Sequence, residues 1–257
     1  MDVLVRRSGP REHVPTRWGS LAFVGKAWGL RTQRWWRDRS APMVRWPQGP
    51  EQDPAWQVPF ELRSALWLDR NGPERTFEIG KVENLRLACS FLNGVVIDAG
   101  GVFSFWRQVG RASRRRGFVI GRMLQQGCVI PAVGGGLCQL SNALYEVALR
   151  YGCEIVERHA HSVRLPNAAI HDATVAWNYV DLRFRVKQRT RVMVRMTAEE
   201  LIVGLGVERA VLPFPLLDLS AASPQEEPAL AVVQSCLTCN ETGCFRHMSR
   251  QRDDPEF

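Results

Sequence analysis

Apolar residues recur at three- and four-residue spacing in two segments, and this spacing predicts two helices. The apolar stripe of the first helix is made by Leu85, Ala88, Cys89 and Leu92. This helix ends at Asn93-Gly94, a pair typical of a left-handed helix cap. The second helix follows the glycines at 134–136 and ends at Gly152, with an apolar stripe made by Leu140, Leu144, Val147, Ala148 and Tyr151. Cys89 lies within a stripe and is therefore predicted to be a core residue.

Alternation of apolar and polar residues predicts strands in the second half of the chain. Residues 179–207 hold three such runs with short polar links, which predicts an antiparallel meander with a solvated, arginine-bearing face. Shorter apolar runs predict strands near 102–106, 118–120, 128–130 and 154–157. Together these elements predict an α+β fold in which an antiparallel sheet packs with a few helices and a glycine loop leads into a central helix.

Composition divides the chain into four parts. Residues 1–75 form an N-terminal extension rich in arginine, proline and tryptophan, and residues 76–210 form the main domain. Residues 211–229 are a linker rich in proline and glutamate, and residues 230–257 are a cysteine-rich C-terminal segment. The chain has 257 residues, 45% of them hydrophobic, which is enough apolar material for a globular core.

The formal net charge of +8 indicates an anionic partner, which could be nucleic acid, a lipid surface or a cell-wall polymer. Residues 31–39 interleave basic residues with Trp35 and Trp36. Such a segment could lie on an anionic membrane surface or stack on nucleic-acid bases. It could equally anchor the extension on the main domain, which we favour because aromatic residues usually pack. Nucleic acid is the least favoured partner, since no recognition motif is present.

The sequence pattern shows no signal peptide and no apolar run long enough to cross a bilayer. We therefore expect a cytoplasmic protein, with membrane association through the extension left open. The odd number of cysteines, seven, fits reduced thiols better than a disulfide framework.

Cys138 falls in the first turn of the second predicted helix, away from its apolar stripe. A helix N-terminus offers unpaired N–H groups and the positive end of the helix dipole, and both stabilise a thiolate. The glycines leave room for a substrate backbone beside amides that could hold an oxyanion. Substrate contacts are predicted at Gly134, Gly135, Gly136, Gln139, Ser141 and Asn142. The residue could be a nucleophile or a small apolar residue buried at a helix start.

His159 and His161 follow the predicted strand 154–157, and two histidines two residues apart on an extended chain point to the same side. Either histidine could be the base for Cys138, or both could bind a metal. Asp172 precedes a strand-like run and could orient an imidazole, as the third member of a nucleophile–base–orienter set does. Taken one at a time, each is better explained as an ordinary surface or turn residue.

The C-terminal segment holds four soft metal ligands within twelve residues, which are Cys236, Cys239, Cys244 and His247. This composition is near that of a closed Cys₃His zinc site, and zinc is the favoured cofactor. The alternatives are ligands of an iron–sulfur cluster or a redox dithiol formed by Cys236 and Cys239.

Residues from about 76 to 207 resemble the VanW family, named for an accessory protein of glycopeptide resistance. The matching blocks are the helix at 84–94, Gly101-Val-Phe-Ser-Phe, Gly134-Gly-Gly-Leu-Cys-Gln, Glu157-Arg-His-Ala-His-Ser and Asp172-Ala-Thr-Val-Ala-Trp. Some secreted relatives are similar to cysteine-dependent L,D-transpeptidases that cross-link peptidoglycan stem peptides. The resemblance implies that Cys138 is the acyl-accepting nucleophile, that His161 or His159 is its base, and that Asp172 orients the base.

Two functions are consistent with these features. The first is a cysteine-nucleophile acyl-transfer enzyme, a peptidyl transferase or amidase, that acts on peptidoglycan or its precursor peptides. Without an export signal, such an enzyme would meet cytoplasmic precursors. The alternative is a non-catalytic accessory or binding protein of cell-wall metabolism or glycopeptide resistance, with a structural metal knuckle at its C-terminal end.

Overall fold

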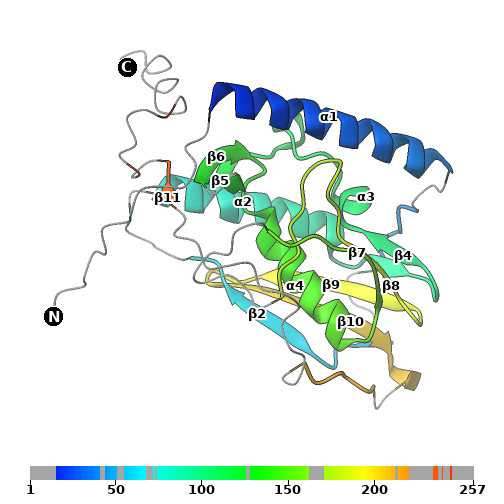
Figure 1. Cartoon of the computed structure of the whole chain (residues 1–257). Helices are drawn as coiled ribbons and strands as arrows, with labels where there is room; N and C mark the ends of the chain where they lie inside the picture. Colours follow the sequence, from blue (N-terminus) through cyan, green and yellow to red (C-terminus); the bar gives the residue numbers. More distant parts are fainter. Residues whose placement is uncertain are drawn as a thin grey trace.

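The computed structural model describes residues 16–40, 44–50, 55–67, 72, 74–125, 128–161, 171–211, 214–219, 234–236, 239 and 244. Helices pack against antiparallel sheets, as Figure 1 shows, and this confirms the predicted α+β fold. No helix among these residues is both long enough and apolar enough to cross a bilayer.

The largest sheet has five strands, and its centre is a hairpin of β9 (Thr190–Met196) and β10 (Glu200–Glu208). Strand β3 (Val96–Ile97) pairs with the far side of β9. Two short strands, β1 (Trp56–Gln57) and β2 (Glu61–Ala65), pair with successive parts of β10. Residues 56–65, which the composition groups with the N-terminal extension, therefore belong to the same sheet as the C-terminal hairpin.

Two smaller sheets complete the β structure. In one, β8 (Arg183–Arg185) lies between β4 (Val102–Ser104) and β7 (Glu154–Glu157). In the other, β5 (Ile120–Gln125) and β6 (Cys128–Val133) form a hairpin, and β11 (Gln234–Ser235) runs parallel to β6. Strand β8 therefore does not join β9 and β10 in one meander. Phe184 of β8 instead stacks on Phe103, its partner in β4, with ring centroids 4.7 Å apart.

Helices α2 (Arg75–Leu92) and α4 (Leu137–Arg150) contact each other and the main sheet, and both predicted apolar stripes are buried. Where a strand is predicted at 102–106, the strand ends at Ser104. The Ser104 hydroxyl accepts a hydrogen bond from the Arg107 amide and caps the short helix α3 (Phe105–Val109). Two short 3₁₀ helices, at Arg114–Arg116 and Arg209–Val211, complete the described elements.

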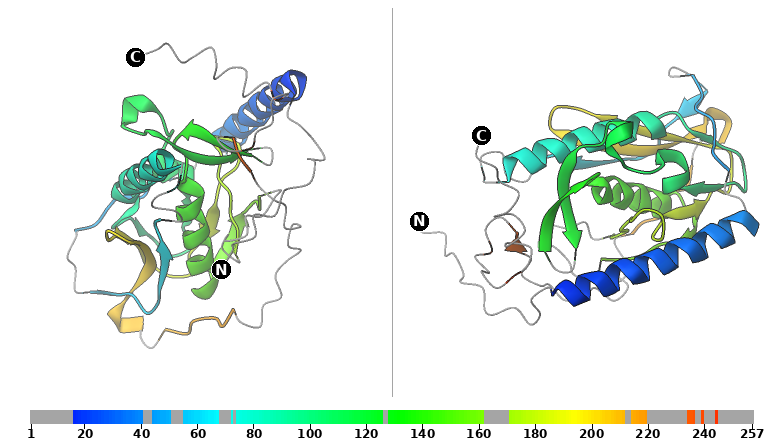
Figure 2. Two further views of the ribbon diagram at one scale, coloured as in Figure 1. Left: turned by 90° about the vertical axis from the view of Figure 1, so that its left-hand side faces the viewer. Right: turned by 90° about the horizontal axis from the view of Figure 1, so that it is seen from above.

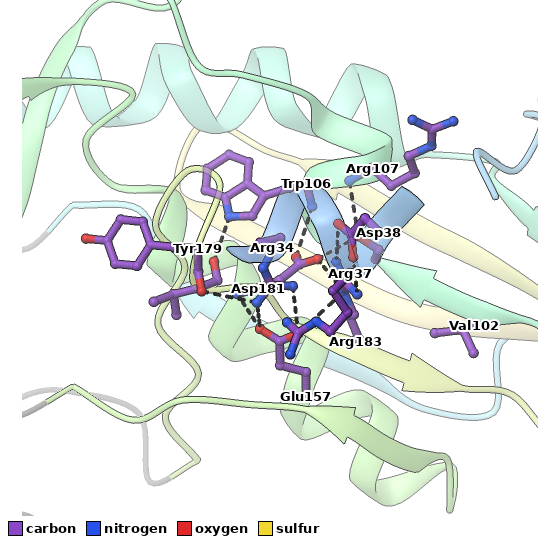
Figure 3. A network of polar contacts seen from close by, with 12 residues as sticks. Arg34, Arg37, Asp38, Val102, Trp106, Arg107, Glu157, Tyr179, Asp181 and Arg183 are labelled. Atoms are coloured by element: carbon purple, nitrogen blue, oxygen red, sulfur yellow. Dashed lines mark hydrogen bonds and ion pairs between the residues drawn. The ribbon is translucent and has the colours of Figure 1, made fainter. Parts of the chain in front are cut away.

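Helix α1 (Arg17–Ser40) runs along the outside of the domain in all three views (Figures 1 and 2). A buried ionic network holds it there (Figure 3). The Arg34 guanidinium donates hydrogen bonds to both carboxylate oxygens of Glu157 in β7. Asp38 accepts two hydrogen bonds, of 3.1 and 3.0 Å, from Arg183 of β8, and Arg183 also donates to Asp181 at 2.8 Å.

The network corrects one expectation, because Arg183 does not lie on a solvated face. Its side chain is buried, and the carboxylates of Asp38 and Asp181 compensate its charge. Burial raises the pKa of the Glu157 carboxyl, but the Arg34 hydrogen bond and the charges of Arg34 and Arg183 outweigh burial and hold this pKa below its ordinary value.

We predict that Glu157→Gln lowers the free energy of unfolding by about 3 kcal/mol at neutral pH, because it leaves buried Arg34 without its charge partner. Because the pKa of Glu157 is lowered from 4.5, its contribution is fully present above that pH and is lost as the pH falls through the folded-state pKa. Urea unfolding of both proteins across this pH range measures the difference.

Glu154→Gln on the same strand is the matched control. Glu154 and its partner Arg185 are both exposed, so this change should cost at most about 1 kcal/mol. Equal losses in the two variants, or a loss in Glu157→Gln that does not shrink in acid, would contradict the prediction.

Candidate active site

The loop before α4 is built from glycines because the protein packs tightly around it. Gly134 and Gly136 have φ angles of 77° and 100°, a region that L side chains rarely adopt. A Cβ on Gly135 would lie 2.3 Å from the backbone carbonyl carbon of Gly121, and a Cβ on Gly136 would lie 2.1 Å from Cγ of Lys81. At Gly135 and Gly136 the space that a side chain would need is therefore filled by β5 and α2.

Asn84 of α2 fixes this loop from behind. Its side-chain amide donates hydrogen bonds of 3.0 Å to the carbonyl oxygens of Gly135 and Val119, and its Oδ1 accepts one of 2.9 Å from the Val119 amide. The Asn84 side chain is fully buried, so all these bonds form away from solvent. The start of α4 therefore has a fixed position relative to α2.

Cys138 is the second residue of α4 and is partly exposed. Its Sγ lies 3.5 Å from the Thr174 hydroxyl oxygen and 3.9 Å from the Val175 carbonyl oxygen. The His161 side chain acts on the same sulfur, and its hydrogen bonding and charge lower the pKa of the thiol. The thiol therefore meets an imidazole at the N-terminal end of a helix, where backbone N–H groups and the helix dipole favour negative charge.

Asp172 holds the His161 ring in this position. The Nδ1 atom of His161 lies 2.7 Å from Oδ1 of Asp172, and the His161 backbone amide donates a hydrogen bond of 2.5 Å to Oδ2. Because Nδ1 is engaged with the carboxylate, Nε2 is the ring nitrogen left for the thiol. The structure thus places Asp172, His161 and Cys138 in one chain of interacting side chains, in which Asp172 bonds His161 and His161 acts on the thiol.

The charges of this chain reinforce each other. Burial raises the pKa of the Cys138 thiol, but the hydrogen bond and charge of His161 outweigh burial and lower it. Burial lowers the pKa of His161, but Asp172 and Cys138 together raise it to about 10. Burial raises the pKa of Asp172, and His161 more than offsets this, so that the pKa is lowered. These directions favour a thiolate–imidazolium pair at neutral pH.

His159 lies apart from this chain. Its Nε2 atom is 3.4 Å from the Glu157 carboxylate, and its side chain is half exposed. Residues 158–161 are not in a strand, so the expected alternation of an extended chain does not apply to the two histidines. Of the two, the structure brings His161 to Cys138.

Three polar residues predicted to contact substrate have hydrogen-bond partners within the protein, and their substrate contact stays a prediction. The Gln139 amide donates hydrogen bonds to the Ser64 hydroxyl (3.1 Å) and the Ala65 carbonyl oxygen (2.8 Å) of β2. The Ser141 hydroxyl donates a 2.6 Å bond to the Ala173 carbonyl oxygen. Asn142 Oδ1 accepts a 2.7 Å bond from the Ala173 amide. Ser141 and Asn142 therefore fasten to α4 the segment that carries Asp172 and Thr174.

A family model described as VanW like protein matches residues 80–205. This range includes Cys138, His161 and Asp172. The chain carries a VanW-like domain.

Two relatives agree with the family match. Over 152 residues the chain is 34% identical to the vancomycin B-type resistance protein VanW of Enterococcus faecalis (strain ATCC 700802 / V583). The aligned region is 56% of this chain and 55% of that protein. Over 151 residues it is 31% identical to the uncharacterized protein YoaR of Bacillus subtilis (strain 168). The aligned region is 57% of this chain and 50% of that protein. The chain thus spans about half the length of each relative. No solved structure matches it significantly.

Sequence reasoning missed two features of the VanW-like domain that contact the candidate site. Thr174 touches the thiol, and because residues 172–175 are not in a strand, its spacing of two from Asp172 is no signal for this contact. Lys81 lies against Gly136 and pairs with Glu78 at 3.0 Å. Burial lowers the pKa of Lys81, and the Glu78 carboxylate partly offsets this. No short motif marks a buried lysine–glutamate pair on a helix.

The predicted metal cluster lies at the edge of what the structure describes. Cys236 and Cys244 are buried and Cys239 is partly buried, whereas His247 lies outside the described residues. The Cys236 amide donates a 2.9 Å hydrogen bond to the Val129 carbonyl oxygen, next to the β11–β6 pairing. Among the described residues, no group of three or more His, Cys, Asp or Glu side chains could hold a metal ion. Zinc, or an iron–sulfur cluster, at this segment stays a prediction.

We predict that iodoacetamide at pH 6.5 alkylates Cys138 at least about tenfold faster than Cys89 or Cys153 in the folded protein. The reason is that burial raises the pKa of both other thiols to about 12, whereas the pKa of Cys138 is lowered. Peptide mapping by mass spectrometry measures the three rates. In denatured protein the three alkylation rates should become equal. If Cys138 in the folded protein reacts no faster than Cys153, Cys138 is not a thiolate at this pH.

We also predict that His161→Gln raises the pKa of Cys138, because it removes the hydrogen bond and the charge that stabilise the thiolate. His159→Gln is the matched control, since its ring faces Glu157, and it should leave that pKa unchanged. Thiolate ultraviolet absorbance against pH reports both values. Equal behaviour of the two histidine variants would show that His161 does not act on the sulfur.

Proposed function

We propose that this VanW-like protein is a cysteine-dependent acyl-transfer enzyme. The observation that supports this most is the position of Cys138 at the start of a helix, with its pKa lowered by His161, whose ring Asp172 holds by a 2.7 Å contact. Nucleophile, base and orienting carboxylate are the parts that covalent catalysis by a thiol requires. A structural cysteine needs none of them, and Cys89 and Cys153 have none.

The first half-reaction uses the ion pair directly. The Cys138 thiolate attacks a carbonyl carbon of the substrate, a C–S bond forms, and the carbonyl oxygen becomes an oxyanion. The Gln139 amide bonds the Gly136 carbonyl oxygen, so the amides that precede it at the start of α4 are the nearest donors for that oxyanion. As the C–N bond breaks, the His161 imidazolium gives its proton to the leaving amine, and an acyl thioester remains on Cys138.

The second half-reaction returns the enzyme to its starting state. Neutral His161 takes a proton from an incoming amine or water, which attacks the thioester carbonyl carbon. The C–S bond breaks, and the thiolate–imidazolium pair forms again. An amine acceptor gives a transpeptidation product and water gives hydrolysis. The Asp172 carboxylate stays ionised throughout and holds the ring with Nε2 toward the sulfur.

The substrate class we propose is a peptidoglycan peptide or a precursor of one. A relative whose name places it in vancomycin resistance supports this choice, as does the family resemblance. The net charge of +8 is compatible with an anionic cell-wall polymer or precursor. A non-catalytic accessory role remains the alternative that the following experiment separates.

We predict that Cys138→Ser lowers turnover of peptidoglycan stem peptides by about a thousandfold or more, because the hydroxyl is not ionised by His161. Chromatography of the released amine measures turnover, and intact-protein mass spectrometry detects the acyl adduct on Cys138. Cys153→Ser, in the same domain, is the control and should retain full activity. Peptide binding by the wild-type protein with neither adduct nor turnover would overturn the proposal in favour of the accessory role.

A further inference from the structure

Helix α1 presents an apolar face to solvent. Four residues on one side of it are largely exposed, namely Trp18 (82%), Leu21 (62%), Val24 (60%) and Trp28 (68%). Their spacing of three, four and seven residues places them on one stripe of the helix. Large apolar side chains that gather on one exposed face mark an interaction surface. Below, these four residues are called the outer stripe of α1.

The opposite side of α1 is fastened to the VanW-like domain, so the helix cannot roll to bury its outer stripe. Ala27 and Arg34 are buried against the domain, and Asp38 binds Arg183. Arg31 Nε donates a 2.9 Å hydrogen bond to the Trp177 carbonyl oxygen. Figure 3 shows Arg34 and Asp38 pointing from α1 into this network. The inner face is thus polar and fixed, and the apolar residues point outward.

The charge of α1 indicates what kind of surface it meets. Its basic residues are Arg17, Lys26, Arg31, Arg34, Arg37 and Arg39. Its one acidic residue is Asp38, whose carboxylate is bonded to Arg183 and does not face outward. Arg17 and Arg39 are exposed on the same side of the helix as the outer stripe, whereas Lys26 is exposed on another side. Tryptophan together with arginine and lysine is typical of helices that lie in the headgroup region of a bilayer.

We propose that α1 docks this protein on the surface of a membrane that contains anionic lipid. The helix lies in the plane of the interface, with the outer stripe inserted among the headgroups and Arg17 and Arg39 beside lipid phosphates. A second copy of the chain fits less well, because two such helices would bring like charges together. Single-stranded nucleic acid also fits less well, because Leu21 and Val24 offer no ring on which a base can stack.

The docking places the candidate site near the lipid. Arg31 bonds Trp177, and the same segment provides Thr174 and Val175, which touch the Cys138 sulfur. A docked α1 therefore holds the segment around Cys138 close to the interface. If the proposed acyl transfer is correct, the substrate is a peptide displayed at the membrane surface. This last step rests on the proposed function, whereas the docking itself does not.

Sedimentation with vesicles tests the docking. The full chain should sediment with vesicles of equal amounts of phosphatidylglycerol and phosphatidylcholine, far less with phosphatidylcholine alone, and less as salt is raised. The double variant Trp18→Ser/Trp28→Ser should bind at least about tenfold more weakly, because it removes half of the outer stripe. Val119→Ser/Val156→Ser, which changes two exposed apolar residues away from α1, is the matched control and should bind as the wild type does.

A second pair of variants tests how much the basic residues of α1 contribute to vesicle binding. Arg17→Ala/Arg39→Ala should weaken binding about 25-fold, since each basic residue near an anionic surface contributes about fivefold. Arg114→Ala/Arg115→Ala removes the same charge from exposed positions of a 3₁₀ helix and should have little effect. Brominated lipids should quench the fluorescence of the wild type more than that of Trp18→Ser/Trp28→Ser.

Three results would overturn the docking. They are no sedimentation of the wild type with anionic vesicles, equal loss of binding in each α1 variant and its control, and self-association through the outer stripe with no lipid binding. Iodoacetamide labelling of Cys138 in the same preparations keeps the two proposals apart. Reactive Cys138 without lipid binding removes the docking alone, and lipid binding with unreactive Cys138 removes the acyl transfer alone.

Discussion

The attachment of the segment 171–175 to helix α4 is the constraint on which the candidate site depends. Ser141 and Asn142 hold the Ala173 backbone by its carbonyl oxygen and its amide, at 2.6 and 2.7 Å. Asp172 and Thr174 flank that residue, so both are carried to the first turn of α4. Without this attachment, the carboxylate that orients His161 would have no fixed position relative to the sulfur, and a thiolate–imidazolium pair would have no reason to form there.

The other side of the site is held equally firmly by packing. The glycine loop fits against Gly121 and Lys81 so closely that a single Cβ would clash, and Asn84 binds the carbonyl oxygen of Gly135. The start of α4 is therefore placed by contacts with α2 and β5 as well as by its own helical turn. Groups that react with each other must be positioned to within a fraction of an ångström, and rigid packing of this kind provides that precision.

Charge is distributed differently on the two sides of α1. The charges on the inner side hold the helix on the domain, and those on the outer side are available to a binding partner. On the inner side, Arg34 and Arg183 are buried and Glu157 is partly buried, and each contacts an opposite charge at short range. On the outer side, Arg17 and Arg39 remain exposed beside apolar residues. Buried charges compensate one another and hold an element in place, whereas exposed charges of one sign act on partners at a distance.

The sequence by itself determined the features that depend on neighbours along the chain. Periodicity and glycine placement predict α2, α4 and the β9–β10 hairpin, and they put Cys138 in the first turn of a helix. Three features appear only in the tertiary structure. His161 rather than His159 lies with Asp172 at the site, β8 pairs with β4, and the tryptophans of α1 are exposed. These outcomes depend on contacts between distant segments, such as Arg34 with Glu157, and spacing along a chain carries no record of which distant residue will be the partner.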